Sequence, residues 1–108
     1  MSRYRLSVEA SEDLIAIYIQ GHDRFGPLQT DRYQDELTAL FGQLAAFPGL
    51  ARLRLDYEPP VRVFAYKAHV IIYDEEPGGI VIQRVHHSHE DWRGDPRGGD
   101  EGTNHDIL

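Results

Sequence analysis

Two stretches in the first half of the chain place apolar or small residues at the spacing of amphipathic helices. The first follows an i, i+4, i+7, i+8 pattern through Ala10, Leu14, Ile17, Tyr18 and Gly21. The second repeats this spacing through Tyr33, Leu37, Leu40, Phe41 and Leu44. Only Gly26-Pro27 punctuates the chain between them. Two helices joined by so short a link are expected to pack as an antiparallel hairpin.

The helix ends are marked by residues that start or stop a helix. Ser7 is suited to cap a first helix that begins near residue 8 or 9, with Ser11 as a competing cap. Pro27 fits the first turn of the second helix, where its missing N–H group costs nothing. Phe47 precedes a proline, which disfavours the α region, so the second helix is predicted to stop there.

Alternating and β-branched residues indicate strands before the first helix and after the second. We predict strands at residues 4–8, 51–56, 61–66, 69–73 and 80–87, with turns at 67–68 and 75–79. The last strand runs out into the polar stretch Arg84-Val85-His86-His87. The order β, α, α and then three or four β-strands is an α+β fold. In it, the helix hairpin packs on one face of a small antiparallel sheet.

Charge and composition divide the chain into a domain, residues 1–92, and a tail, residues 93–108. From Glu90 onward there are six acids and two bases, whereas the preceding residues carry twelve acids and nine bases. The Gly- and Asp-rich tail is predicted to be disordered unless bound. The domain is itself mildly acidic and lacks the basic face that phosphate neutralisation requires, so we expect no direct nucleic-acid binding.

Several classes of protein are disfavoured by what the sequence lacks. It has no cysteine, which removes disulfides and thiolate chemistry. It has no apolar run near the roughly 20 residues needed to cross a bilayer, and its start lacks the apolar core of a signal peptide. Gly78-Gly79 is not followed by a helix, so it is no phosphate-binding loop. We therefore expect a cytoplasmic protein that needs no cofactor and no membrane.

Histidines at the end of the last predicted strand raise the possibility of a metal site. His87 and His89 would point to one face of a strand and offer two imidazoles. Zinc usually takes three or four protein ligands, and the sequence places no third one. We predict no metal site.

Two arginines, Arg62 and Arg84, are embedded in strands that are otherwise apolar. The simpler interpretation is a solvated sheet face, and local evidence favours it. The alternative is a polar patch of Arg62, Arg84 and His87 that grips phosphate and suits RNA cleavage. In that case the arginines would stabilise charge at phosphorus and the imidazole would transfer a proton. The sequence does not fix the register of the strands, so it assigns no catalytic residue.

The chain as a whole resembles a known family over about residues 4–92. Short motifs in the order and spacing of that family carry the resemblance: Tyr4-Arg5-Leu6-Ser7, Val61-Arg62, His69-Val70-Ile71-Ile72-Tyr73, and Ile82-Gln83-Arg84-Val85-His86-His87 with Asp91. They resemble the ParE branch of the ParE/RelE toxin superfamily. The resemblance implies a helix hairpin on a small sheet. It also implies a bacterial toxin that arrests growth and is encoded beside its antitoxin.

The resemblance implies two modes of action, between which the residues discriminate. ParE-type toxins poison DNA gyrase, whereas RelE-type toxins cleave messenger RNA on the ribosome. RelE-type cleavage relies on a lysine and arginine cluster and on a tyrosine or histidine near the end of the last strand. Here Lys67 is the only lysine and no tyrosine follows the last strand. These departures favour a gyrase inhibitor that is not an enzyme. The alternatives are an mRNA endoribonuclease using Arg62, Arg84 and His87, or a degenerate, non-toxic binding module.

The resemblance also implies partners: a ParD-like antitoxin in a hetero-oligomer, and gyrase as the target. The candidates for contact with a target or partner are Arg52, Arg62, Tyr73, Arg84, His87 and Asp91. The candidates for an apolar groove that receives an antitoxin helix are Leu28, Leu40 and Phe47. The alternative for these apolar residues is that they close the core.

Overall fold

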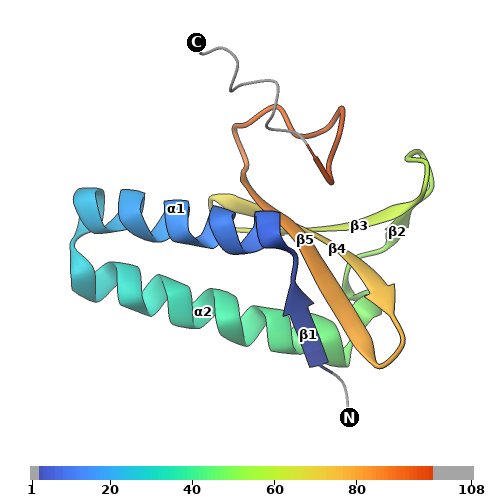
Figure 1. Cartoon of the computed structure of the whole chain (residues 1–108), viewed down its shortest axis with the longest axis horizontal. Helices are drawn as coiled ribbons and strands as arrows, with labels where there is room; N and C mark the ends of the chain where they lie inside the picture. Colours follow the sequence, from blue (N-terminus) through green and yellow to red (C-terminus); the bar gives the residue numbers. More distant parts are fainter. Residues whose placement is uncertain (1–2, 99–108) are drawn as a thin grey trace.

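The computed structural model describes residues 3–98, which form two long helices beside one five-stranded sheet (Figure 1). In chain order, the elements are β1 (Arg3–Leu6), α1 (Val8–Phe25), α2 (Pro27–Ala46), the 3-10 turn η1 (Pro48–Leu50), β2 (Leu53–Arg54), β3 (Val61–Tyr66), β4 (His69–Glu76) and β5 (Gly79–His87). The α+β class, the helix hairpin and the order of elements are as predicted.

The sheet is mixed, which corrects the prediction of an antiparallel one. Its strand order is β1-β5-β4-β3-β2, and β1 pairs with β5 in parallel while every other pair is antiparallel. The parallel pair brings the backbone of Arg3 very close to Gly79, where a Cβ would lie only 1.7 Å from the Arg3 carbonyl oxygen. Glycine at this position is therefore what lets β1 join the sheet.

The local signals at the helix ends act as predicted. The Ser7 hydroxyl oxygen accepts a hydrogen bond from the Ala10 N–H (2.9 Å) and caps α1, while its own proton goes to the Gln83 carbonyl (2.7 Å). Gly26 adopts a φ of +83° between the helices, a value that favours glycine. Pro27 then opens α2.

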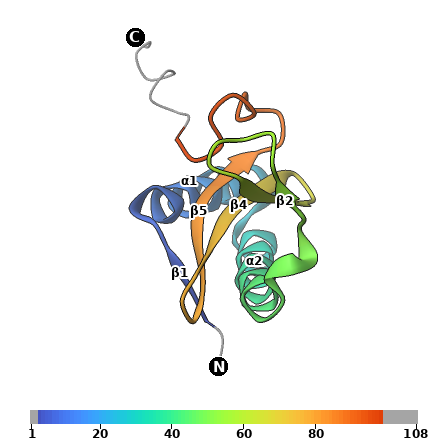
Figure 2. The ribbon, with the colours of Figure 1, turned by 90° about the vertical axis from the view of Figure 1, so that its right-hand side faces the viewer.

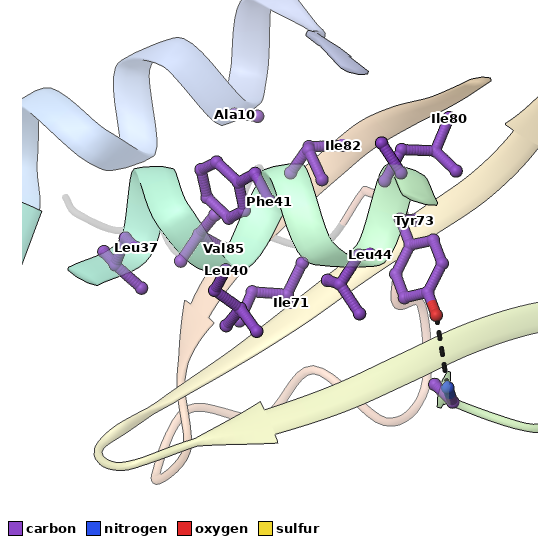
Figure 3. Close-up of a cluster of buried hydrophobic side chains, with 12 residues drawn as sticks. Ala10, Leu37, Leu40, Phe41, Leu44, Ile71, Tyr73, Ile80, Ile82 and Val85 are labelled. Atoms are coloured by element: carbon purple, nitrogen blue, oxygen red, sulfur yellow. Dashed lines mark hydrogen bonds between the residues drawn. The ribbon is translucent and has the colours of Figure 1, made fainter. Parts of the chain in front are cut away.

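The main core lies between the helix hairpin and one face of the sheet. Figure 3 shows α2 contributing Leu37, Leu40, Phe41 and Leu44, and the strands contributing Ile71, Tyr73, Ile80, Ile82 and Val85. The Tyr73 hydroxyl donates to the Pro48 carbonyl (2.6 Å) and accepts from the Ala51 N–H (3.3 Å). This buried phenol therefore fixes η1 and the chain that leads to β2.

Three parts of the strand prediction differ from the structure. The first strand, expected at residues 4–8, is β1 at Arg3–Leu6, because α1 already begins at Val8. The strand expected at residues 51–56 is only two residues long, because β2 pairs with β3 only where Leu53 and Arg54 face Arg62 and Val61. The turn expected at 75–79 is shorter, since β4 continues to Glu76 and β5 starts at Gly79. Only Pro77-Gly78 then turns the chain, with Gly78 at a φ of +85°.

The other face of the sheet carries a second, smaller core, which the segment 92–98 covers. Trp92 packs on Val61, Val70 and Ile72. Arg97 forms an ion pair with Asp74 (2.6 Å) and donates hydrogen bonds to the carbonyls of the β2–β3 loop, Pro59 and Pro60. Figure 2 shows this segment beside that loop. We call residues 92–98 the C-terminal clip.

The C-terminal clip corrects the prediction for the start of the tail. Residues 93–98 were expected to be disordered unless bound, yet they pack on the domain. Pro96 is buried, and its carbonyl lies 2.8 Å from Nε2 of the buried His86. Residues 99–108, on which the rest of that prediction falls, lie outside the described residues.

An ion pair ties the start of α1 to the edge of β5. The Asp13 carboxylate accepts hydrogen bonds from Nε (2.7 Å) and Nη2 (2.8 Å) of Arg84, and from the Val85 N–H (2.9 Å). The pairing of β1 with β5 ends at Leu6 and Ile82, so Asp13 supplies an acceptor where β1 no longer does. Both side chains are largely buried, with exposures of 14% for Asp13 and 5% for Arg84.

Replacing Asp13 should destabilise the fold strongly. We expect Asp13→Ala to lower the free energy of unfolding by about 3 kcal/mol, because the buried Arg84 charge loses this bidentate partner. Urea denaturation measures the change. The matched control is Glu12→Ala, at an exposed site one residue earlier on the same helix, with an expected effect below about 0.5 kcal/mol. Equal losses in the two variants would contradict the assigned role.

Candidate functional site

The structure does not bring Arg62, Arg84 and His87 together. Arg62 pairs with Tyr73, whose side chain lies in the main core, so Arg62 projects to the helix side of the sheet. Arg84 pairs with Ile72, which belongs to the second core on the opposite face. His87 returns to the helix side opposite His69, four residues along β4 from Tyr73. This separation is about 13 Å along the strand.

A β-bulge causes this division. Between Ile72 and Tyr73 the β4–β5 register shifts, so that Ile72 faces Arg84 while Tyr73 faces Ile82, and Gln83 has no direct partner. Strict alternation from Ile82 would have placed Arg84 on the helix side with Arg62. The bulge reverses the faces, so the alternative interpretation, a phosphate-gripping patch of Arg62, Arg84 and His87 on one surface, is wrong. The favoured interpretation, a solvated sheet face, is wrong for Arg84, which is only 4% exposed.

Both arginines are engaged within the domain. The Arg62 guanidinium donates to the Glu75 carboxylate (2.7 Å) and to the Ala51 carbonyl (2.6 Å). Arg84 is held by Asp13 and also donates to the carbonyl of Gly98 in the C-terminal clip. Both side chains therefore have structural roles. Arg62 fixes the segment before β2 through the Ala51 carbonyl, and Arg84 connects β5 to α1 and to the C-terminal clip.

The other candidates for contact with a target or partner differ in accessibility. Tyr73 is completely buried, which corrects its placement among surface candidates. Arg52 and Asp91 are exposed, and His87 is partly buried. Arg52 and Asp91, together with the partly buried His87 and Arg62, are therefore the members of that set that a partner can reach.

The proposed groove residues do not form a groove. Leu40 is only 6% exposed and belongs to the main core, so its placement in an antitoxin groove is wrong. Leu28 and Phe47 are 74% and 66% exposed but lie at opposite ends of α2, about 28 Å apart along the helix. They therefore cannot line one groove.

An exposed apolar surface that includes Phe47 surrounds the short edge strand β2. Four exposed apolar side chains gather along η1 and β2: Phe47, Leu50, Leu53 and Leu55. We call them the β2-edge patch. Arg52 and Arg54 alternate with these leucines. β2 is the last strand of the sheet, and within residues 3–98 no strand pairs with its outer side. The patch combines apolar area, positive charge and a free strand edge.

The second apolar surface follows the outer face of α1. Val8, Ile15 and Ile19 are all exposed and lie at i, i+7 and i+11, so they share one face of the helix. The predicted inner face of this helix does not include them. The sequence did contain a signal for this surface. Ile15 and Ile19 are apolar but lie outside the predicted inner face, so they had to be exposed.

A pocket of about 580 Å³ opens where the helix hairpin extends past the sheet. Its walls come from residues 17–25 of α1, residues 29–36 of α2, the β3–β4 turn at 67–69, and His87. We call it the hairpin pocket. Sequence reasoning missed it because its walls come from four separate segments, and no local motif brings them together.

Histidine and tyrosine side chains form one wall of the hairpin pocket. The Tyr33 hydroxyl lies 2.7 Å from Nδ1 of His69, and the His69 ring meets the His87 ring edge-on at 5.4 Å. Burial lowers the pKa of His69 to about 4, and the nearby His87 adds to this shift. Burial also raises the pKa of Tyr33 to about 12. Both groups are therefore neutral at pH 7.

A charged cluster lies at the mouth of the same pocket. Lys67, held at a φ of +52° in the tight β3–β4 turn, pairs with Glu36 (2.8 Å) and lies over the Tyr66 ring (5.4 Å). The hydrogen bonds of Glu36 with Lys67 and Tyr66 lower the pKa of the Glu36 carboxyl and raise those of its two partners. The turn is thereby anchored to α2.

The part of the chain that the structure describes contains no group of side chains that could serve as metal ligands. The His87 and His89 rings do lie near each other, with centroids 5.1 Å apart. Within residues 3–98, however, no three histidine or acidic side chains converge in a way that could hold a metal ion. Across the same residues, no helix is long and apolar enough to span a bilayer.

Stability should fall as the pH is lowered through the range set by His69. An unfolded histidine titrates near 6.5, whereas folded His69 titrates at about 4. Between these values the unfolded chain binds a proton that the folded protein does not, so the free energy of unfolding decreases from pH 7 to pH 5. We expect His69→Gln to remove about 1 kcal/mol of this decrease, allowing for partial exposure. Urea denaturation at both pH values measures it.

The exposed His22 on α1 provides the control for this measurement. His22→Gln should leave the loss between pH 7 and pH 5 as large as in the unmodified protein. If His69→Gln also leaves it unchanged, other groups cause the pH dependence.

Comparisons with known proteins agree with this architecture. A family model described as the ParE toxin of the type II toxin-antitoxin system parDE matches residues 4–92. A solved structure described as the chromosomal ParDE TA system from P. aeruginosa has a TM-score of 0.67 and 21% identity, covering 81% of this chain and 96% of that one. No curated protein is similar enough to count as a match. The structural likeness shows the fold, and the match of the family model to most of the chain shows the family. The chain belongs to the ParE toxin family of type II toxin-antitoxin systems.

Proposed function

We propose that this ParE-family toxin acts in the cytoplasm by inhibiting DNA gyrase through protein–protein contact, and that a ParD-like antitoxin neutralises it in a hetero-oligomer. The observation that carries the choice of mechanism is the division of Arg62 and Arg84 between opposite faces of the sheet. A nuclease needs its phosphate-binding and proton-transfer groups on one surface. The described residues place Arg62, Arg84 and His87 apart, which favours inhibition by contact over catalysis.

The β2-edge patch supports the neutralisation part of the proposal. Leu55 is 75% exposed, and the neighbouring Arg52 and Arg54 form no ion pair among residues 3–98. An acidic segment with apolar side chains would bury the leucines, pair with both arginines and add a strand to the free edge of β2. We propose this patch as the main docking surface for the antitoxin.

Inducing the chain in bacteria should arrest growth, and the purified protein should block supercoiling by gyrase while messenger RNA stays intact. The variant His87→Ala should retain this inhibition, because a contact inhibitor needs no proton-transfer group. A gyrase supercoiling assay and mapping of transcript ends measure the two activities side by side.

Two other results would each replace the proposal. Cleaved transcripts with unaffected supercoiling, abolished by His87→Ala, would identify a ribosome-dependent endoribonuclease. Normal growth together with tight antitoxin binding would identify a degenerate binding module.

Substitutions in the β2-edge patch should weaken antitoxin binding. We expect Leu55→Glu to raise the dissociation constant for the antitoxin from the adjacent reading frame at least about tenfold, because it places an acid where an apolar anchor docks. Isothermal titration calorimetry measures it. The matched control is Ile19→Glu on the outer face of α1, which is also an exposed apolar site. A larger loss for Ile19→Glu would move the docking surface to α1.

A further inference from the structure

The hairpin pocket is a local concentration of positive charge in an acidic chain. Arg24 and Arg32 both line it, from α1 and α2 respectively. Neither side chain forms an ion pair or hydrogen bond among the described residues, although the charge of Arg32 also contributes to lowering the pKa of Glu36. The pocket contains one further pair of charges, Lys67 and Glu36, which neutralise each other. The pocket therefore has two guanidinium groups in excess, although the whole chain carries a net charge of −7.

Hydrogen bonds at Nδ1 leave Nε2 as the available nitrogen of both imidazoles that line the pocket. The Tyr33 hydroxyl shares a hydrogen bond with Nδ1 of His69 (2.7 Å). Nδ1 of His87 accepts from the His89 N–H (3.1 Å), so the proton of the neutral His87 ring lies on Nε2. The lining thus adds an imidazole N–H donor to the two guanidinium groups, a combination that selects an anion rich in acceptors.

The size and the aromatic content of the pocket restrict this anion further. A volume of about 580 Å³ is far larger than inorganic phosphate requires and lies in the usual range for organic ligands. Phe25, which is 59% exposed, and the partly buried Tyr33 offer ring surfaces beside the arginines. A planar base can stack on such rings while a phosphate engages the guanidinium groups.

We propose that the hairpin pocket binds a nucleoside monophosphate, with Arg24 and Arg32 on the phosphate, the imidazole of His87 donating to its oxygen atoms, and the base beside Phe25 and Tyr33. The site is distinct from the β2-edge patch. The proposal goes beyond the proposed function and does not depend on gyrase or on an antitoxin. It requires only a small ligand, because the acidic surface outside the pocket disfavours long nucleic acids.

The test uses the full chain and four probes: AMP, inorganic phosphate, adenosine and glutamate. We expect AMP to bind with a dissociation constant below about 1 mM and at least about tenfold more tightly than any other probe, as measured by isothermal titration calorimetry. Arg32→Gln should weaken AMP binding at least about fivefold, since it removes one bidentate phosphate contact. The control Arg52→Gln, at an exposed arginine of the β2 edge, should leave it unchanged.

Several outcomes would contradict the proposal in part or in full. Equal affinity for inorganic phosphate and AMP would exclude the nucleoside part, and equal affinity for glutamate would indicate a carboxylate site instead. No binding of AMP at millimolar concentration, or equal weakening by Arg32→Gln and Arg52→Gln, would overturn the proposal. Because both arginines are exposed, circular dichroism should show unchanged folding in both variants.

Discussion

The position of the helix hairpin on the sheet depends on one carboxylate, that of Asp13. Strand β1 covers only the first part of β5, and beyond Ile82 the edge of β5 would be left with an unpaired N–H group. Asp13 accepts from that group on Val85 and holds the Arg84 guanidinium at the same time. An unpaired donor buried at this point would cost free energy, so α1 has a single favourable placement along β5. The hairpin pocket and the exposed face of α1 both follow from that placement.

Elements with local signals could be predicted from the sequence. Ser7 caps α1, and Gly26 and Pro27 separate the helices, as their residue types indicate. The turn at Lys67 joins β3 to β4 where the strand patterns on either side of it predict a turn. The parallel pairing of β1 had no such signal, because it depends on a close approach to Gly79 from a distant part of the chain. Long-range pairing of this kind leaves little trace in local periodicity.

The candidate site was less predictable, and the reason is a single extra residue. Alternation along β5 would assign Arg84 to the same side as Ile80 and Ile82, but the bulge at Gln83 reverses the side chains that follow it. A one-residue shift moves every later side chain to the other face. His86 consequently lies buried beside Trp92, while His87 reaches the hairpin pocket. The chemistry available at each surface therefore depends on a register shift that residue types alone do not reveal.

The C-terminal clip shows that the similarity boundary of the family and the physical boundary of this domain differ. The family match ends at Trp92, yet Arg97 and Pro96 beyond it hold Asp74 and His86 on the second face of the sheet. A recombinant protein that ends at residue 92 would keep Trp92 and lose residues 93–98, the rest of the C-terminal clip. A fusion partner or affinity tag attached at residue 92 would replace the segment that packs on the sheet through Pro96 and Arg97. For this protein, the C-terminal attachment point belongs after residue 98.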